Sequence, residues 1–345
     1  MKAIRTLGFS TSIFCALSAS VAHAATGTWN GGAGNWNTTD VGWTGVTGTP
    51  WDSTNGATNS AIFGGTAGTV SLTSGVFANA LTFNTTGYTI SGANTLTLAG
   101  TTPTVTTGSG VTATISSIVA GTNGLTKEGA GTLTLSGLNT FTGVVNVNAG
   151  ILTSATTSTV AGSFLGGAGT SGARRVVNIA SGAKIQVDSA GGNSFLNHGA
   201  VLANGGYGSF YDINISGTLA IHDGTVGSNH QILQSTYNLS NGGIITKTTG
   251  SYSGGYAGLL FGFGGAGGGN INVTGTGNQI TTSSIAFFNG AKITTNAGAE
   301  LTISSQIGGG ASSVGSNVIK DGAGTLIFTG NNNYTGTTAI NAGTL

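Results

Sequence analysis

The sequence predicts an all-β chain folded as a right-handed parallel β-helix, or β-solenoid, in which short strands coil into stacked rungs. Three observations predict this fold: short segments that alternate apolar and polar residues, abundant glycine with frequent turn signals, and an internal repeat. Helix signals are nearly absent after residue 24, because good helix formers such as Glu, Lys, Gln and Arg are scarce.

The predicted strands are three to five residues long. Examples are 69–73 (TVSLT), 81–83 (LTF), 95–98 (TLTL), 132–135 (TLTL) and 145–147 (VNV). Side chains of a strand point to opposite faces in turn, so Leu, Ile, Val and Phe are expected inside the coil and Thr, Ser and Asn outside. In-register Thr and Asn of successive rungs can then form ladders. Glycine is expected at the corners between strands.

The composition is unlike that of a globular enzyme. Only 5% of the 345 residues are charged and 65 are glycine, whereas a globular domain has about 25% charged residues. Two prolines leave few obstacles to continuous strand pairing. Removing Lys2 and Arg5 with the N-terminal segment changes the formal net charge from +1 to −1. Nucleic acid and anionic membranes are therefore not expected as partners.

Residues 1–24 are predicted to be a signal peptide. Lys2 and Arg5 precede an apolar stretch from Leu7 to Val21, and residues 22–24 (AHA) form a small-x-small cleavage site. The single cysteine, Cys15, lies within this segment, so the mature chain is expected to have no disulfide and no cysteine metal site. No later apolar run is long enough to span a membrane.

An internal repeat links two distant parts of the chain. Residues 127–152, beginning KEGAGTLTLSG, match residues 320–345, beginning KDGAGTLIFTG, at a constant offset of 193 residues. Degenerate copies of the strand-and-turn pattern lie between them, which favours one extended array. We therefore expect residues 25–100 to form a Trp-rich N-terminal cap with the first coils. Residues 101–345 are then the β-helix array, and rungs of roughly 20 to 25 residues give on the order of 13 to 16 coils.

The two matched segments resemble the autotransporter-associated β-strand repeat, also called the passenger-associated transport repeat. Both carry its G-x-G-T-L-x-L/F-x-G core, an N-x-[FY]-x-G turn and a closing N-A-G. The resemblance implies a passenger-type β-helix that is exported by a bacterium and displayed at the cell surface, in association with the outer membrane, or secreted. No translocator barrel is encoded in these residues, so we expect a fragment or a passenger exported by another route.

Ionisable side chains gather in the middle of the chain. They are Arg174, Arg175, Lys184, Asp188, His198, Asp212, His222, Asp223 and His230. One interpretation is a β-helical polysaccharide-degrading enzyme with its site in residues 188–230, for example Asp212 with His222 and Asp223. The favoured interpretation is solvated loop residues without catalysis. We expect no catalytic, cofactor-binding or metal-binding residues, because no second carboxylate pair supports Asp212 and Asp223 and no metal-ligand spacing is present.

Two further patterns have structural and functional interpretations. Residues 262–267 (GFGGAG) satisfy G-x-G-x-x-G, but no amphipathic helix follows, so this is interpreted as a loop or corner and not a cofactor site. The four tryptophans, Trp29, Trp36, Trp43 and Trp51, are interpreted as a cap sealing the first coil. The alternative is a sugar-stacking patch. Phe141 and Tyr334, at equivalent repeat positions, are interpreted as structural.

The sequence thus predicts an exported, adhesin-like structural or interaction protein that is not an enzyme. Its expected partners are surface glycans or other cells.

Overall fold

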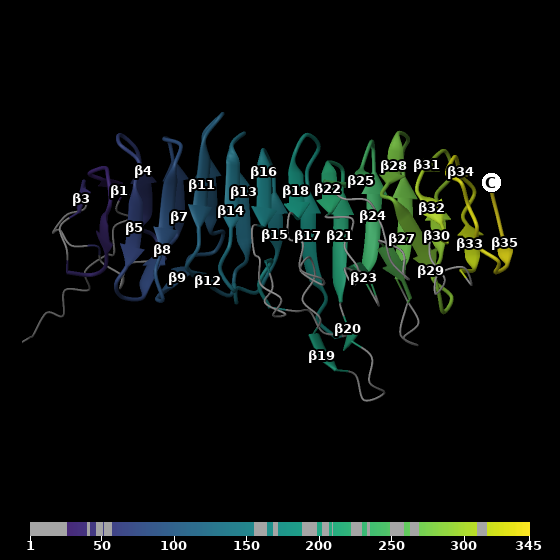
Figure 1. Ribbon diagram of the computed structural model, residues 1–345, viewed down its shortest axis with the longest axis horizontal. Helices are drawn as coiled ribbons and strands as arrows, with labels where there is room; N and C mark the ends of the chain where they lie inside the picture. Colours follow the sequence, from purple (N-terminus) through teal and green to yellow (C-terminus); the bar gives the residue numbers. More distant parts are fainter. Residues whose placement is uncertain are drawn as a thin grey trace, which may run out of the picture.

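A computed structural model shows an elongated rod of stacked strands running from β1 to β35 (Figure 1). The structure describes residues 26–39, 42–45, 51, 57–154, 164–167, 172–187, 199–201, 207–208, 210–221, 230–232, 235–248, 259–262, 269–308 and 316–345. These residues form strands and turns and no helix, so none of them lies in a helix able to cross a membrane.

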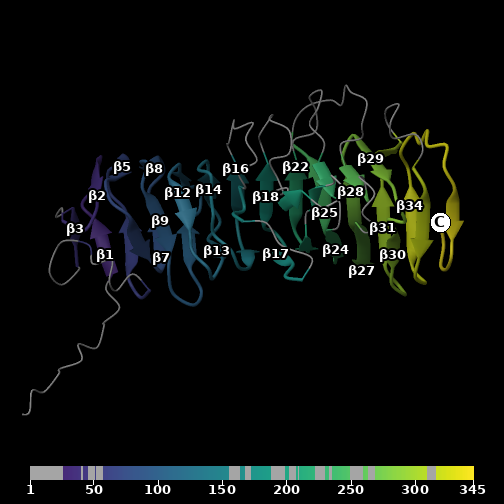
Figure 2. The same ribbon diagram turned by 90° about the horizontal axis from the view of Figure 1, so that it is seen from below.

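Two long sheets form most of the rod (Figures 1 and 2). Sheet A has 14 strands, in the order β3 (Trp43–Thr44), β1 (Thr26–Trp29), β4 (Ser60–Phe63), β7 (Ala80–Phe83), β10 (Thr104–Thr107), β13 (Leu125–Glu128), β15 (Val145–Val147), β17 (Arg175–Ile179), β21 (Tyr211–Ile215), β24 (Thr236–Ser240), β27 (Asn270–Thr274), β30 (Ile293–Thr295), β33 (Val318–Asp321) and β35 (Thr338–Ile340). Sheet B has 12 strands, in the order β2 (Gly34–Trp36), β5 (Thr69–Leu72), β8 (Tyr88–Ser91), β11 (Thr112–Ile115), β14 (Thr132–Leu135), β16 (Ile151–Ser154), β18 (Lys184–Val187), β22 (Thr218–Ile221), β25 (Ile244–Lys247), β28 (Asn278–Thr281), β31 (Glu300–Ile303) and β34 (Thr325–Phe328).

Shorter sheets complete the coil. One contains β6 (Val76–Ala78), β9 (Thr95–Leu98) and β12 (Ile118–Ala120), and another contains β23 (His230–Ile232), β26 (Leu259–Phe261), β29 (Ser284–Phe287) and β32 (Gln306–Ile307). The hairpin of β19 (Gly199–Val201) and β20 (Tyr207–Gly208) stands off the rod (Figure 1). Among the strand pairs described, only this hairpin and β1–β3 are antiparallel.

The parallel β-helix is confirmed by this topology, because strands adjacent in each long sheet come from successive turns of the chain. Its right-handed sense stays a prediction from the handedness of parallel crossovers. The expected alternation is also present: β7, β9, β10 and β14 each have the burial pattern half-buried, buried, half-buried, buried. The buried residues of successive rungs form one continuous apolar core inside the rod.

An asparagine ladder runs along the outside of sheet A. Asn146, Asn178, Asn214, Asn238 and Asn272 occupy one register on five consecutive strands. Each amide nitrogen donates to the amide oxygen of the preceding asparagine, over 2.7 to 2.9 Å. The ladder predicted from the sequence thus exists, and it fixes the register of the rungs that carry it.

The glycine spacing that the two repeats share has a steric cause. Gly129 and Gly322 both have φ of +74°, in the left-handed region that favours glycine. A Cβ on Gly131 would lie 2.2 Å from the carbonyl oxygen of Gly108, and one on Gly324 would lie 2.2 Å from that of Asn296. These corners therefore admit only glycine, because the preceding rung lies too close for any side chain.

The four tryptophans are buried together at the N-terminal end of the core. Ring centroids of Trp43 lie 5.0 Å from Trp36 and 4.8 Å from Trp51. The cluster continues into the core through Phe63, whose ring lies 5.5 Å from Trp43 and stacks on Phe83 at 4.8 Å. None of the four indoles is more than 5% exposed, so they offer no open face to a sugar ring. We propose that this aromatic cluster caps the first coil.

Truncating this cluster should loosen the N-terminal rungs first. Trp36→Ala is expected to cost about 3–5 kcal/mol of stability, the usual range for removing a buried large aromatic. Because each rung contacts only its neighbours, hydrogen exchange should accelerate over residues 60–98 and stay unchanged over 270–303. Phe77→Ala is the matched control, since Phe77 lies in the same region but is 43% exposed. Equal effects of the two substitutions would contradict the cap.

Candidate functional site

The central ionisable cluster contains an ion pair on the outer face of the rod. Arg174, just before β17, places its Nε 2.7 Å from Oδ1 of Asp212 on β21. Its Nη2 also donates to the backbone oxygen of Tyr211 at 2.6 Å and to Oγ1 of Thr236 at 3.2 Å. Arg174 therefore spans three successive rungs, and Asp212 is engaged in holding them together.

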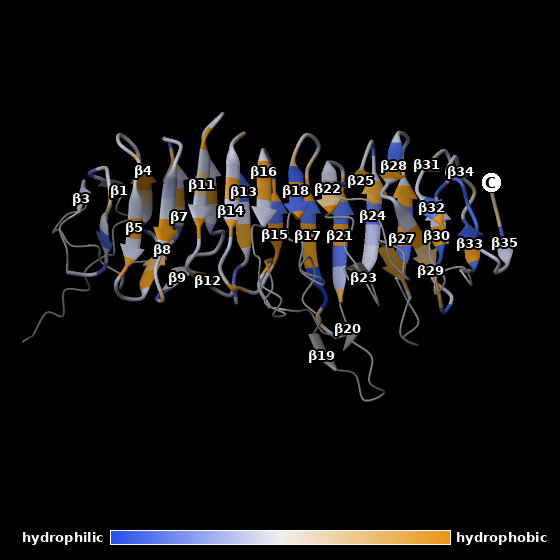
Figure 3. Cartoon of the chain, viewed as in Figure 1, coloured by the Kyte–Doolittle hydropathy of each residue, from blue (hydrophilic) through white to orange (hydrophobic). Residues whose placement is uncertain are grey.

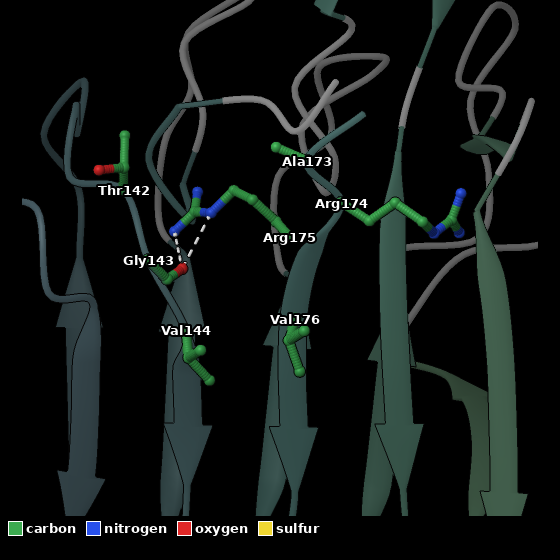
Figure 4. Close-up of a pocket in the computed structure, with 7 residues that line it drawn as sticks. All are labelled: Thr142, Gly143, Val144, Ala173, Arg174, Arg175 and Val176. Atoms are coloured by element: carbon green, nitrogen blue, oxygen red, sulfur yellow. Dashed lines mark hydrogen bonds between the residues drawn. The ribbon is translucent and has the colours of Figure 1, made fainter. Parts of the chain in front are cut away.

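Arg175 points the opposite way and is buried. Its Nε and Nη2 each donate to the backbone oxygen of Gly143 at 3.1 Å (Figure 4). Its Nη1 donates to the backbone oxygens of Leu165 and Gly167. The guanidinium lies 5.3 Å from the ring centroid of Phe141. Burial is the main cause that lowers the pKa of Arg175. Arg175 thus fastens a corner of the coil through backbone carbonyls.

A cleft of about 370 Å³ opens beside these arginines (Figure 4). It lies between the residues before β15 and the start of β17, and it is lined by Thr142, Gly143, Val144, Ala173, Arg174, Arg175 and Val176. The lining contains no carboxylate and no imidazole, and Arg174 points away from it toward β21 (Figure 4). Its chemistry suits contact with a ligand more than general acid–base catalysis.

Most of the other candidates of the enzyme hypothesis fall in segments that the structure does not describe. Asp188, His198, His222 and Asp223 lie outside the described residues, as do residues 263–267 of the glycine-rich motif. His230 lies in β23, and Lys184 is half-buried in β18. Among the residues that the structure describes, no three His, Cys, Asp or Glu side chains group to hold a metal ion. The predicted absence of catalytic and metal residues stays a prediction.

Sequence reasoning missed the role of two lysines. Lys127 and Lys320, the first residues of the matched segments, are buried. Nζ of Lys127 donates to the backbone oxygens of Glu128 and Gly129 at 2.8 Å and, in the next rung, of Ala149 at 3.2 Å. Nζ of Lys320 does the same toward Asp321 at 2.9 Å, Gly322 at 2.6 Å and Ala342 at 2.9 Å. We call this arrangement the lysine clamp.

The lysine clamp holds an ammonium group inside the corner of the coil. Burial lowers the pKa of Lys127 to about 8, and the nearby Glu128 carboxylate opposes part of this shift. Burial also lowers the pKa of Lys320. The signal in the sequence was the recurrence of lysine before G-A-G in both segments. The partners in the next rung could be identified only from the coil.

Comparisons with known proteins agree with the repeat. Residues 125–153 and 318–345 match the passenger-associated-transport-repeat family. The chain is also 36% identical over 224 residues to the adhesin BmaC autotransporter of Brucella suis biovar 1 (strain 1330). That alignment covers 62% of this chain and 6% of the relative, so the chain spans a small part of that protein. No solved structure matches the chain.

Fold and repeats together define the class: a passenger-type parallel β-helix built from stacked rungs. The chain carries two passenger-associated transport repeats, as the resemblance predicted. Exported, cell-surface localisation follows from the same two matches and agrees with the predicted signal peptide.

Removing the lysine clamp should weaken the stacking of the rungs around it. Lys127→Met keeps the length of the side chain but leaves three partly buried carbonyls without their donor, which is expected to cost about 1–3 kcal/mol. Denaturant unfolding of the purified chain measures the loss. Lys184→Met is the control, because the half-buried Lys184 makes no such contacts with three carbonyls. An unchanged midpoint for Lys127→Met would rule out the clamp.

The depressed pKa of Lys127 also predicts a pH dependence. Because the folded state releases this proton near pH 8 and the unfolded state near pH 10.5, the unfolded state binds more protons between these values. The contribution of Lys127 to the free energy of unfolding should therefore rise as the pH increases from about 8 to 10.5, and it should be constant at lower pH. Comparing unfolding of the wild type and Lys127→Met across this range isolates the site. If the free energy of unfolding of the wild type minus that of Lys127→Met falls with rising pH, the pKa of Lys127 is raised and the prediction is wrong.

Proposed function

We propose that this chain is an adhesive segment of a surface-displayed passenger, which binds other cells or their surface glycans and does not catalyse a reaction. The observation that carries the proposal is the 36% identity, over 62% of the chain, with a protein named as an adhesin. The coil supports it, because a rigid rod of stacked rungs extends its outer faces over a length that a compact domain of this size lacks.

The Arg174–Asp212 pair supports a role without catalysis. A carboxylate that accepts from an arginine at 2.7 Å is held as a structural anion. A glycoside hydrolase needs a second carboxylate opposite the first, and the described surroundings of Asp212 supply arginine and threonine side chains instead.

Adhesion and catalysis can be separated in one experiment. Beads coated with the exported chain are expected to bind cultured epithelial cells or glycan-coated surfaces, while the chain releases no reducing ends from polysaccharides. Asp212→Asn should leave binding unchanged, since a half-exposed ion pair contributes at most about 1 kcal/mol to stability. Lys247→Gln is a control for loss of a surface charge elsewhere on the rod.

Two results would contradict the proposal. Wild-type beads that bind no cell or glycan surface better than uncoated beads would remove the adhesive role. Polysaccharide depolymerisation that disappears in Asp212→Asn would establish the enzyme hypothesis in its place.

A further inference from the structure

The outward side of sheet B carries an ordered array of hydroxyl groups in its N-terminal half. Thr69, Thr89, Thr114 and Thr134 lie in one register on the consecutive strands β5, β8, β11 and β14. Beside them run Ser71 and Ser91, which pair directly, and Ser116 and Ser136, which directly follow β11 and β14. We call these two rows of side chains the hydroxyl face.

The hydroxyl groups of the threonine row are available to a ligand. All four threonines are half-buried or exposed. Within the described part of the chain, their hydroxyls make no hydrogen bond to the protein, whereas the backbone beneath them is paired in the parallel ladder. Threonine is also stiff at χ1, so these four side chains lose little conformational entropy when a ligand binds.

The face lies in the least charged part of the rod. Between residues 53 and 173 the only ionisable Asp, Glu, Lys, Arg or His residues are Lys127 and Glu128, and Lys127 is buried in its clamp. In Figure 3, β5 and β11 are pale, the colour of residues with intermediate hydropathy. A charged ligand would find no opposite charge here.

We propose that the hydroxyl face binds an uncharged polysaccharide that lies along the rod axis, across β5, β8, β11 and β14. A hydroxyl donates one hydrogen bond and accepts others, so Thr and Ser complement sugar hydroxyls in either direction. The rungs repeat at about 4.8 Å, which presents an equivalent hydroxyl and methyl group to each successive sugar. Each contact is weak, and binding accumulates because neighbouring contacts on one rigid array form together. The inference rests on the proposed adhesive function and names its ligand class.

The opposite sheet provides a matched control. Thr82, Thr106 and Thr126 point outward from β7, β10 and β13 of sheet A. The row that contains Thr82 and Thr106 is less regular, because Ile62 pairs with Thr82 on one side and Glu128 pairs with Thr106 on the other. Valine replaces threonine with nearly the same shape and keeps the preference for strand, so a triple Thr→Val substitution removes hydroxyls without emptying space.

The test is affinity electrophoresis of the full chain in gels that contain a neutral galactomannan, a neutral β-glucan or the anionic polysaccharide alginate. We expect the neutral polymers to retard the wild type and alginate to have no effect. The triple variant Thr89→Val, Thr114→Val and Thr134→Val should bind the neutral polymers at least tenfold more weakly. The control variant Thr82→Val, Thr106→Val and Thr126→Val should bind as the wild type does, and circular dichroism confirms that both variants fold.

In the gel assay, three results would overturn the inference: no retardation of the wild type by either neutral polymer, equal weakening in both triple variants, or stronger retardation by alginate. Sedimentation of the wild type and the first variant tests another occupant. A concentration-dependent dimer lost in that variant would assign the face to a second copy of this chain. Bead adhesion that persists in the first variant would reject this inference alone, whereas wild-type beads that fail to adhere would reject the proposed function.

Discussion

The close stacking of one rung on the next is the constraint on which the rest of the structure depends. Parallel strands about 4.8 Å apart leave no room for a Cβ at Gly131 or Gly324, whose nearest backbone oxygens lie 2.2 Å away from that position. The same spacing allows each asparagine of the ladder to reach the next, and each clamp lysine to reach the following rung. A chain without disulfides can therefore hold its length through contacts between neighbouring turns alone.

Much of this fold could be predicted because its determinants are local. Alternation in segments such as 132–135 decides which side chains face inward, and glycine at 129 and 131 marks a corner. The constant offset between the segments beginning at Lys127 and Lys320 showed that rungs recur, and both segments match one repeat family. Alternation and recurrence together leave few architectures other than a solenoid.

The contacts between rungs could not be predicted, since they depend on which distant residues the coil brings into register. Arg174 and Asp212 were both recognised as candidates, yet their pairing across 38 positions requires β17 to lie beside β21. The neighbouring Arg175 turns inward to the carbonyl of Gly143, and adjacent positions in the sequence gave no sign of this difference. The sequence gave no sign that Lys127 is buried, because its carbonyl partner Ala149 belongs to the next turn.

In this architecture, the inward and outward side chains of each strand have different roles. Inward residues such as Leu133 and Ile115 are fully enclosed by their own and adjacent rungs, so changing them alters stability. Outward residues such as Thr134 and Asn214 lie in register with matching positions on the adjacent strands. The outer faces can thus differ, with uncharged hydroxyls on β5–β14 of sheet B and asparagines on β15–β27 of sheet A, while the core beneath stays apolar. Binding properties of such a rod can therefore vary along its length without a change of fold.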